Sequence, residues 1–421
     1  MKRTTFTSVI ALGVFSAVGA QADTARDVIN GYADLAFAKY SDSLVTAQAL
    51  DAALDAFIAA PSEETHQAAK DAWLASRVPY QQTEAYRFGN AVVDDWEGKV
   101  NAWPLDEGLI DYVDASFYGD SEENNFYNAN VVANATLAVG GQTVDAAMIT
   151  PAVLQDLHEI DGVEANVATG YHAIEFLLWG QDLNGNGPGA GARSYTDFDT
   201  ANCTNGNCDR RAEYLAAASE LLLTDLEEIV AAWDAGGAAR MDLAGMSDAE
   251  GISAMLTGLG SLSYGELAGE RMQLGLILHD PEEEHDCFAD NTHNSHYYDA
   301  KGMQNVYLGS YTASDGTVTT VPSLSGLAAA ANADLDAEMT MKLEATMAAM
   351  QVMKDRADNG IESYDQMIGF ENEEGNAIVQ GAIDALVDQT RSIEALVAVL
   401  GAAEITVEGS DSLDNPSAVF E

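Results

Sequence analysis

The amino-acid sequence predicts an all-α protein. Three observations support this fold class: Ala, Leu, Met, Glu and Asp dominate the composition, strand-like alternation of apolar and polar residues is scarce, and only eight prolines occur in 421 residues. A hydrophobic content of 47% is sufficient for a packed core in spite of a formal net charge of −50. So negative a surface is typical of solvation at high salt, and it excludes nucleic acid and anionic membranes as favourable partners.

The N-terminal residues have the pattern of a secretory signal peptide. Lys2 and Arg3 precede an apolar run from Val9 to Val18, and small residues lead up to Ala22. The apolar run is too short to span a bilayer. We therefore expect cleavage near Ala22, export to the periplasm or cell envelope, and no transmembrane segment once the signal is removed.

The remaining chain divides into helical segments and irregular stretches. Thr150 and Pro151 are an N-cap and a first-turn proline for the third helix. The predicted helices cover residues 24–60, 62–90, 151–180, 210–234, 248–278, 324–357 and 375–401. The irregular stretches between them are 91–149, 181–209 and 279–323.

The stretch richest in Gly and Asn, residues 181–209, is the best candidate for a domain boundary. Two helical halves on either side of it fit the pattern. The predicted organisation is a signal peptide at 1–22, an N-terminal helical domain at 23–185, a linker at 186–211, a C-terminal helical domain at 212–401, and an acidic tail at 402–421 that we expect to fray.

Cysteine spacing agrees with an exported protein. Cys203 and Cys208 stand five residues apart across an Asn-Gly turn, which favours a local disulfide in an oxidising compartment. Cys287 is left over, and a buried free thiol is the simpler interpretation than a thiolate ligand.

The helix that contains "GYHAIEFLLWG" carries polar residues where a buried helix should have none. Ala168, His172, Glu175 and Trp179 follow the spacing of three and four residues that places side chains on one helical face. A buried carboxylate must find a cation, a metal or a proton. A satisfied His–Glu pair inside the core is the alternative to a ligand role.

Two further helices show stripes of this kind, and either one alone has a plain explanation as a solvated ion pair. Three stripes in one helical protein favour a polar site between helices, because bundles build metal sites from facing helices. The second stripe comprises Trp73, Arg77, Tyr80, Glu84 and Arg87. The third comprises Ser263, Glu266, Glu270 and Gln273, with Arg271 adjacent.

Two loops are weaker candidates for metal binding. The segment "HDPEEEHDCFADNTHNSHYYD" could coordinate a transition metal through Glu283, His285, Asp290 and His293, although an acidic surface loop with incidental histidines explains it equally well. "DLNGNG", residues 182–187, matches the opening of a calcium loop. The closing acidic position is Arg193, so a Gly/Asn-rich turn is the simpler explanation.

Familiar hydrolase motifs are absent from the sequence. "HEIDG" at 158–162 lacks the second histidine of a His-Glu-x-x-His zinc motif, and Phe176 follows Glu175 where the inverted motif requires histidine. No Gly-x-Ser-x-Gly nucleophile elbow occurs.

Several longer segments resemble the imelysin-like family, also classed as M75 peptidases, and in particular its iron-regulated protein A branch. The Gly-x-His-x-x-Glu signature is present, and the similarity extends over nearly the whole chain after the signal. The segments that carry it are "GYHAIEFLLWG", "WLASRVPYQQTEAYRFG", "VNAWPLDEGLIDY", "WGQDLNGNGPGAGARSYTDF", "YGELAGERM" and "EEEHDCFADNTHNSH".

The resemblance implies an all-helical protein of two bundle-like domains, with a polar site at their interface and a link to iron acquisition in the cell envelope. The family's signature residues correspond to Gly170, His172 and Glu175. Arg77 and Glu84 correspond through the second quoted segment. Asp286 and Ala289 stand where the resemblance leads us to expect serine, so a contact made by those serines would be lost here.

Three functions remain open from the sequence. The first is a non-enzymatic envelope protein that binds iron or an iron chelate, with envelope iron-transport components as partners. The second is a metallopeptidase in which His172 binds zinc and Glu175 is a ligand or the general base. The third is an envelope interaction module. For the metal site we predict His172, Glu175, Glu84, Glu266 and Glu270, supported by Arg77, Tyr80, Tyr171 and Arg271. Iron is the predicted metal, ahead of zinc or calcium.

Overall fold

The computed structural model describes residues 23–119, 121, 124–139 and 141–420. The predicted signal peptide lies outside these residues. The protein is mainly helical, as the sequence predicts. Two antiparallel hairpins are the exceptions, β1 (Thr136–Val139) with β2 (Gln142–Asp145) and β3 (Ser310–Thr312) with β4 (Val318–Thr320). Within the described residues, no helix combines the length and the apolar character needed to cross a membrane.

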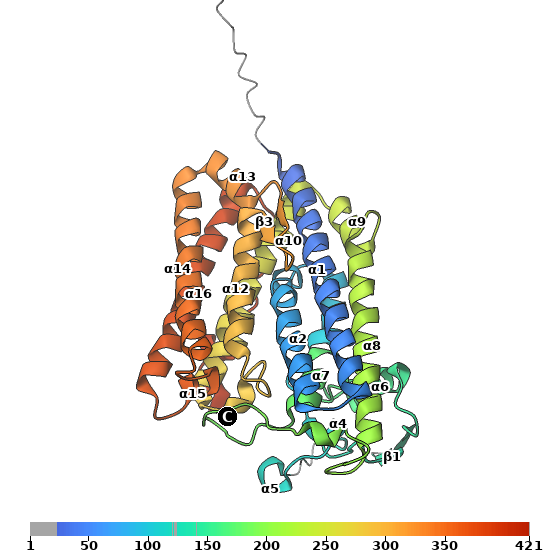
Figure 1. Ribbon diagram of the computed structural model, residues 1–421. Helices are drawn as coiled ribbons and strands as arrows, with labels where there is room; N and C mark the ends of the chain where they lie inside the picture. The colour runs from blue at the N-terminus through green and yellow to red at the C-terminus, as the bar shows by residue number, and fades with distance from the viewer. Residues whose placement is uncertain (1–22, 120, 122–123, 140, 421) are drawn as a thin grey trace, which may run out of the picture.

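One group of long helices forms the N-terminal side of the molecule (Figure 1). Its members are α1 (Ala25–Ala59), α2 (Glu63–Gln81), α3 (Ala91–Asn101), α7 (Gly170–Trp179), α8 (Cys208–Trp233) and α9 (Ala238–Gly245). Capping boxes at Thr24 and Ser62 begin α1 and α2, so these starts are fixed by local sequence. Helix α1 packs against α2 and α8, while α7 packs against α2, α3 and α8. Short elements between them are η1 (Glu84–Tyr86), α4 (Glu107–Ile110), α5 (Ala115–Tyr118), α6 (Pro151–Leu157), η2 (Ile160–Gly162) and η3 (Tyr195–Asp197).

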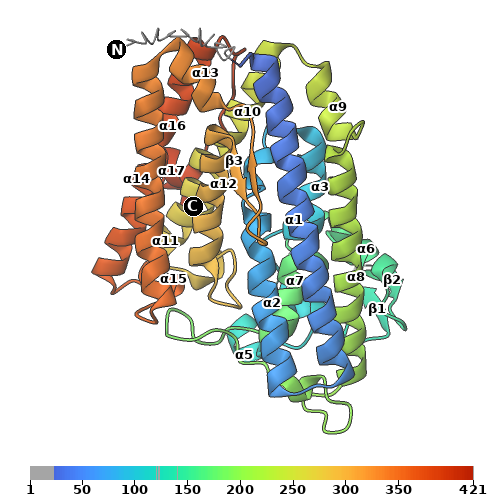
Figure 2. The ribbon, with the colours of Figure 1, turned by 45° about the horizontal axis from the view of Figure 1, so that its top comes forward.

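The second group lies beside the first, and Figure 2 shows it from a different angle. Helix α10 (Asp248–Ser261) continues through the π-helical segment η4 (Leu262–Gln273) into α11 (Leu274–Leu278). Its other members are η5 (Pro281–Glu283), α12 (Thr292–Leu308), α13 (Leu324–Ala331), α14 (Ala333–Asp358), α15 (Tyr364–Ile368), α16 (Glu373–Leu400), α17 (Asp411–Asp414) and η6 (Ala418–Phe420). Helix α16 packs against α14 and η4, and α12 packs against both α14 and α2.

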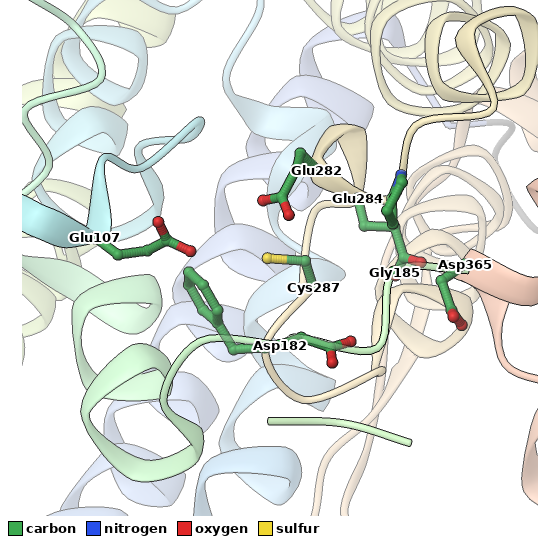
Figure 3. Close-up of a pocket in the computed structure, with 9 residues that line it drawn as sticks. Glu107, Asp182, Gly185, Glu282, Glu284, Cys287 and Asp365 are labelled. Atoms are coloured by element: carbon green, nitrogen blue, oxygen red, sulfur yellow. The ribbon is translucent and has the colours of Figure 1, made fainter. Parts of the chain in front are cut away.

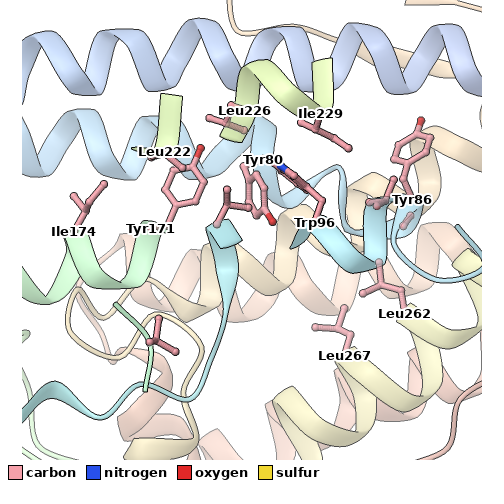
Figure 4. Close-up of a cluster of buried hydrophobic side chains, with 14 of the residues drawn as sticks. Tyr80, Tyr86, Trp96, Tyr171, Ile174, Leu222, Leu226, Ile229, Leu262 and Leu267 are labelled. Atoms are coloured by element: carbon pink, nitrogen blue, oxygen red, sulfur yellow. The ribbon is translucent and has the colours of Figure 1, made fainter. Parts of the chain in front are cut away.

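Apolar and aromatic side chains from both groups meet in a common core. Figure 4 shows Tyr80 and Trp96 near Tyr171 of α7 and Leu226 of α8, with Leu267 of η4 farther along the same cluster. All five residues are buried. Helix α7, which carries His172 and Glu175, is therefore enclosed by other elements on all sides.

Several predicted boundaries were wrong, each for a physical reason. The helix expected at 62–90 ends at Gln81, two residues after Pro79. The helix expected at 151–180 is broken because Glu159 and Asp161 adopt positive φ angles of 53° and 64°. Helices α3 and α12 lie in stretches that we interpreted as irregular.

Helix α8, which begins within the linker expected at 186–211, packs against α1 of the first group. The division into two domains stays a prediction. Cys203, in the loop before α8, forms a disulfide with Cys208, the first residue of α8. Cys287 is a buried free thiol, as expected. The acidic tail docks rather than frays: the Ser412 hydroxyl donates to the Gly269 carbonyl at 3.0 Å.

Candidate metal centre

Helix α7 can approach α3 closely because it begins with glycine. Gly170 has a φ of +79°, and a Cβ atom there would lie 2.4 Å from the Val100 carbonyl oxygen. The Thr169 hydroxyl donates to the Lys99 carbonyl at 2.8 Å and ties the same two segments together. The glycine of the signature therefore has a backbone role, and it sets where His172 is placed.

His172 and Glu175 lie one turn apart on α7 and contact each other. His172 Nδ1 and Glu175 Oε2 share a hydrogen bond of 3.0 Å, and both side chains are fully buried. The Ala289 backbone N–H donates to Glu175 Oε1 at 2.9 Å. Burial, and then the charge of Asp286, raise the pKa of Glu175 well above its usual range. Because both carboxyl oxygens are engaged, Glu175 orients the His172 ring.

The loop between η5 and α12 brings His285 and Asp286 to His172. Each of these three residues offers a ligand atom, and the three atoms lie within 4.8 Å of one another. The two imidazole rings meet edge to face with their centroids 4.8 Å apart, and the Trp103 ring packs beside both. His172 Nε2 and His285 Nδ1 are buried without a hydrogen-bond partner, so both nitrogens are available to a metal.

Asp286 is held by an arginine from α2. Arg77 Nη2 donates to Asp286 Oδ1 at 2.8 Å, and Arg77 Nη1 donates to Asn101 Oδ1 at 2.7 Å. The guanidinium carbon lies 5.5 Å from the Tyr80 ring centroid and 5.0 Å from that of Tyr171. The two tyrosines therefore support the centre through Arg77.

The protonation states suit metal ligation. Burial, followed by the charge of Arg77, lowers the pKa of His172 to about 3. Burial also holds the pKa of His285 well below its usual range. Burial alone would raise the pKa of Asp286, but Arg77 keeps it below the ordinary value. Near neutral pH the two imidazoles are neutral and Asp286 is ionised, as metal ligands must be.

A cleft of about 590 Å³ opens beside the centre. His285 is part of its lining and connects it to the buried ligands. Seven acidic residues and two arginines also line it: Asp94, Glu97, Glu159, Glu164, Glu266, Glu270, Glu283, Arg87 and Arg271. The excess of carboxylates favours the entry of cations.

Two of the carboxylates that we expected to face His172 bind an arginine instead. Arg271 Nη2 lies 2.7 Å from Glu84 Oε2, and Arg271 Nε donates to Glu266 Oε1 at 2.8 Å. Asp299 Oδ2 accepts from Arg271 Nη1 at 3.1 Å. Glu270 is an exposed residue of the cleft. Glu84, Glu266 and Glu270 are thus not part of the cluster of ligand atoms.

Two of the three stripes predicted from the sequence do not lie along one face of a continuous α-helix. Because α2 ends at Gln81, Glu84 lies on the separate turn η1. Because η4 is π-helical, residues five apart become neighbours, which pairs Glu266 with Arg271. Ser263 turns away and donates to the Leu386 carbonyl of α16 at 2.9 Å.

The four residues predicted as a second site do not gather in one place. His285 joins His172, and Glu283 lines the cleft. His293 Nε2 lies 3.5 Å from Asp358 Oδ1, away from the centre. Burial, and then the charges of Asp365 and Asp182, raise the pKa of Asp290 to about 7, and its carboxylate is not part of the cluster at His172.

Sequence reasoning missed three residues of the centre. Asp286 is absent from the predicted ligand sets, although it directly follows His285 in the histidine-rich loop. Asn101 and Trp103 received no role, and nothing in their local spacing distinguishes them. They reach the site because α3 ends there and the chain turns past His172.

The fold and this centre define a class: a mainly helical protein with a buried cluster of two histidines and one aspartate beside an acidic cleft. The chain belongs to the imelysin family, peptidase M75, whose model matches residues 36–393. This confirms the family predicted from the sequence motifs.

Two proteins described as iron-regulated protein A are similar to this chain. One, from Synechococcus elongatus, is 33% identical over 99 residues, which are 23% of this chain and 28% of that protein. The match thus spans less than a third of that relative's length. The other is a crystal structure of a protein from Parabacteroides distasonis, described as a precursor of iron-regulated protein A. It aligns with a TM-score of 0.62 at 18% identity, covering 91% of this chain and 97% of that one. At this identity the structural likeness establishes the fold alone.

Proposed function

We propose that the protein binds iron at His172, His285 and Asp286 and serves iron acquisition in the cell envelope. The observation that carries this proposal is the convergence of three ligand atoms within 4.8 Å. Two histidines with one carboxylate are the donor set that non-haem Fe(II) sites use, and they leave coordination positions open. The names of the two similar proteins support a link to iron.

The surrounding residues have supporting roles in this proposal. Glu175 fixes the orientation of His172, and Arg77 keeps Asp286 ionised before a metal arrives. The acidic cleft raises the local concentration of cations next to His285. An iron chelate of small size would have to enter through this cleft, whose volume is about 590 Å³.

A metallopeptidase is the alternative, because two histidines and a carboxylate also hold catalytic zinc. The geometry favours binding over hydrolysis. Both oxygens of Glu175 are engaged and its side chain is fully buried, so it is not placed to activate a water for attack on a polypeptide. A non-catalytic interaction module is the third candidate, and it requires no metal.

Export and envelope partners are part of the proposal as well. They rest on the signal-like pattern of residues 1–22 and on the names of the similar proteins. An iron-transport component of the envelope is the expected kind of partner.

Calorimetric titration with Fe(II) under anaerobic conditions, Fe(III)-citrate and Zn(II) tests the metal centre. We expect one equivalent of iron to bind to the native protein. Binding should be lost in His172→Ala/His285→Ala and kept in the control His293→Ala, because His293 lies outside the cluster.

Equal iron binding by the native protein and the double variant would contradict the proposal. Peptide hydrolysis that zinc restores after chelation, and that the double variant lacks, would establish the peptidase alternative. Unchanged partner binding without any metal would favour the interaction module.

A further inference from the structure

A second, narrower cavity lies against the loop that carries His285, and this loop contributes Glu284, Cys287 and Phe288 to its lining. Its volume of about 10 Å³ has room for about one water-sized particle, which excludes an organic ligand. Figure 3 shows the acidic side chains around it and the sulfur of Cys287. Its acidic lining comes from four segments: Glu107 of α4, Asp182 of the loop after α7, Glu282 and Glu284 at η5, and Asp365 of α15.

Within the part of the chain that the structure describes, these carboxylates have no basic partner. None of the five forms an ion pair with Lys, Arg or His within 4.0 Å across residues 23–119, 121, 124–139 and 141–420. Other buried carboxylates of this chain do have one: Asp111 contacts Arg193 and Arg211, and Glu84 contacts Arg271.

Two members of the lining are deeply buried and carry carboxyl oxygens that have no hydrogen-bond partner among the described residues. Glu284 is 1% exposed, and neither of its carboxyl oxygens has a hydrogen-bond partner. Asp365 is 2% exposed, and its Oδ2 is likewise without a partner. Groups of this kind need a cation or a proton.

We propose that this cavity binds one hard divalent cation, with Ca²⁺ as the preferred ion, and that the ion draws together the carboxylates of Asp182, Glu284 and Asp365. Among the described residues, the oxygens of these three side chains do not form a cluster within 4.8 Å as the ligand atoms of the histidine centre do. Oxygen donors select hard ions over transition metals. The one sulfur in the lining does not change this choice, because burial keeps Cys287 in its neutral thiol form, which is a poor ligand. Ca²⁺ suits the site better than Mg²⁺ because the donors come from separate, adaptable segments.

The calcium-like sequence at 182–187 contributes to this site in a different way from an EF-hand. Asp182 Oδ1 accepts from the Asn184 backbone N–H at 2.8 Å, which makes a local turn. Arg193, at the closing position of such a loop, pairs with Asp111 at 2.7 Å. The remaining ligands therefore come from Glu284 and Asp365, which are distant in sequence.

An ion here would brace the loop that carries the metal centre. Glu284 directly precedes His285 and Asp286. Two contacts already join the same segments: Asn186 Nδ2 donates to the Asp365 carbonyl at 2.9 Å, and the Gly191 N–H donates to the Phe288 carbonyl at 2.9 Å. The bound cation would neutralise the repulsion that opposes these contacts. This role does not depend on which metal the histidines bind.

Calorimetric titration with Ca²⁺, after removal of divalent ions with EGTA, tests the proposal. The buffer contains NaCl at physiological ionic strength, roughly 0.15 M, because this salt screens the diffuse attraction of Ca²⁺ to the acidic surface. We expect one saturable equivalent in the native protein. The isosteric variant Glu284→Gln/Asp365→Asn should bind it more than about tenfold more weakly, because charge count sets calcium affinity. Glu159→Gln/Glu164→Gln removes the same charge from the cleft and should bind Ca²⁺ as the native protein does.

A thermal unfolding midpoint that Ca²⁺ raises in the native and control proteins, but not in the cavity variant, would support the same site. Absence of saturable Ca²⁺ binding, equal binding by the cavity variant, or tighter binding of Mg²⁺ would overturn the proposal. If the cavity variant fails to fold, the native protein alone can be tested with Tb³⁺. Excitation of nearby Tyr364 should give Tb³⁺ luminescence, and added Ca²⁺ should displace the Tb³⁺ and abolish the signal. His172→Ala/His285→Ala should keep Ca²⁺ binding, which separates this outcome from that of the iron proposal.

Discussion

Asp286 and Glu284 stand two residues apart on one loop, yet their surroundings are opposite. Asp286 faces Arg77 at 2.8 Å, and its pKa is held below the usual range. Glu284 faces other carboxylates, and its pKa is raised. The chain has 18 Lys and Arg residues for 68 Asp and Glu residues, so most carboxylates must do without a basic partner. A buried carboxylate that lacks one is therefore informative about a missing cation in a way that an exposed carboxylate is not.

The strongest expected contrast is between a buried and an exposed arginine. Arg77→Met should lower the free energy of unfolding by about 3–5 kcal/mol, because it leaves Asp286 buried and ionised without a partner. Arg391→Met is the control: its side chain is 70% exposed and pairs with Asp388, so we expect a change of less than about 1 kcal/mol. Denaturant unfolding measures both. Similar losses in the two variants would show that the Arg77 pair is not a special feature of the centre.

The two neighbouring carboxylates should respond to amide substitution with opposite signs. Without divalent cations, Asp286→Asn should destabilise the protein by about 2 kcal/mol, because it removes the charge that Arg77 faces. Glu284→Gln should stabilise the protein by about 1 kcal/mol, because glutamine has nearly the same shape as glutamate and cannot carry an uncompensated charge. Denaturant unfolding in EGTA gives both values, and a shift of the same sign in both variants would break the comparison.

The pH dependence of stability should show the acidic cavity directly. Burial raises the pKa of Glu107 to about 8 and that of Asp365 to about 6. A carboxyl whose pKa is raised on folding binds more protons in the folded state, so its stabilising effect is present at low pH and is lost as the pH rises through the folded pKa. We therefore expect the free energy of unfolding to fall by about 1 kcal/mol per pH unit between pH 6 and 8 in EGTA.

Addition of Ca²⁺ should flatten that slope, because the ion replaces the protons. Unfolding curves measured at several pH values with and without Ca²⁺ make the test. A stability that rises with pH in EGTA would indicate that buried histidines such as His172 and His296, whose pKa burial lowers to about 3, dominate instead.

The sequence was most informative where the pattern is local. His172 and Glu175 stand out because their helix is otherwise apolar, and the positive φ of Gly170 explains the third member of the signature. Asp286 could not be recognised in this way, because its partner Arg77 is 209 residues away. No periodicity within one helix reports a contact across that separation.

Helix α12 shows the same limit for the fold. Its sequence, "THNSHYYDAKGMQNVYL", contains several residues of low helix propensity and was interpreted as irregular. Packing against α2 and α14 stabilises it as a helix. The pairing of Glu266 with Arg271 was unpredictable for a related reason, because nothing in the residues announces a π-helical turn.

The number of residues in the π-helical segment η4 determines where Arg271 points. Residues 262–273 wind wider than an α-helix, and Arg271 reaches Glu84 and Asp299 from that register. One residue corresponds to about 100° of rotation on a helix, so deleting a single position would turn the guanidinium away from both carboxylates. A relative that is one residue shorter between these positions should therefore lack the Arg271 network even if it retains the arginine. When relatives are aligned, an insertion or deletion in η4 would indicate more about the binding site than many substitutions elsewhere.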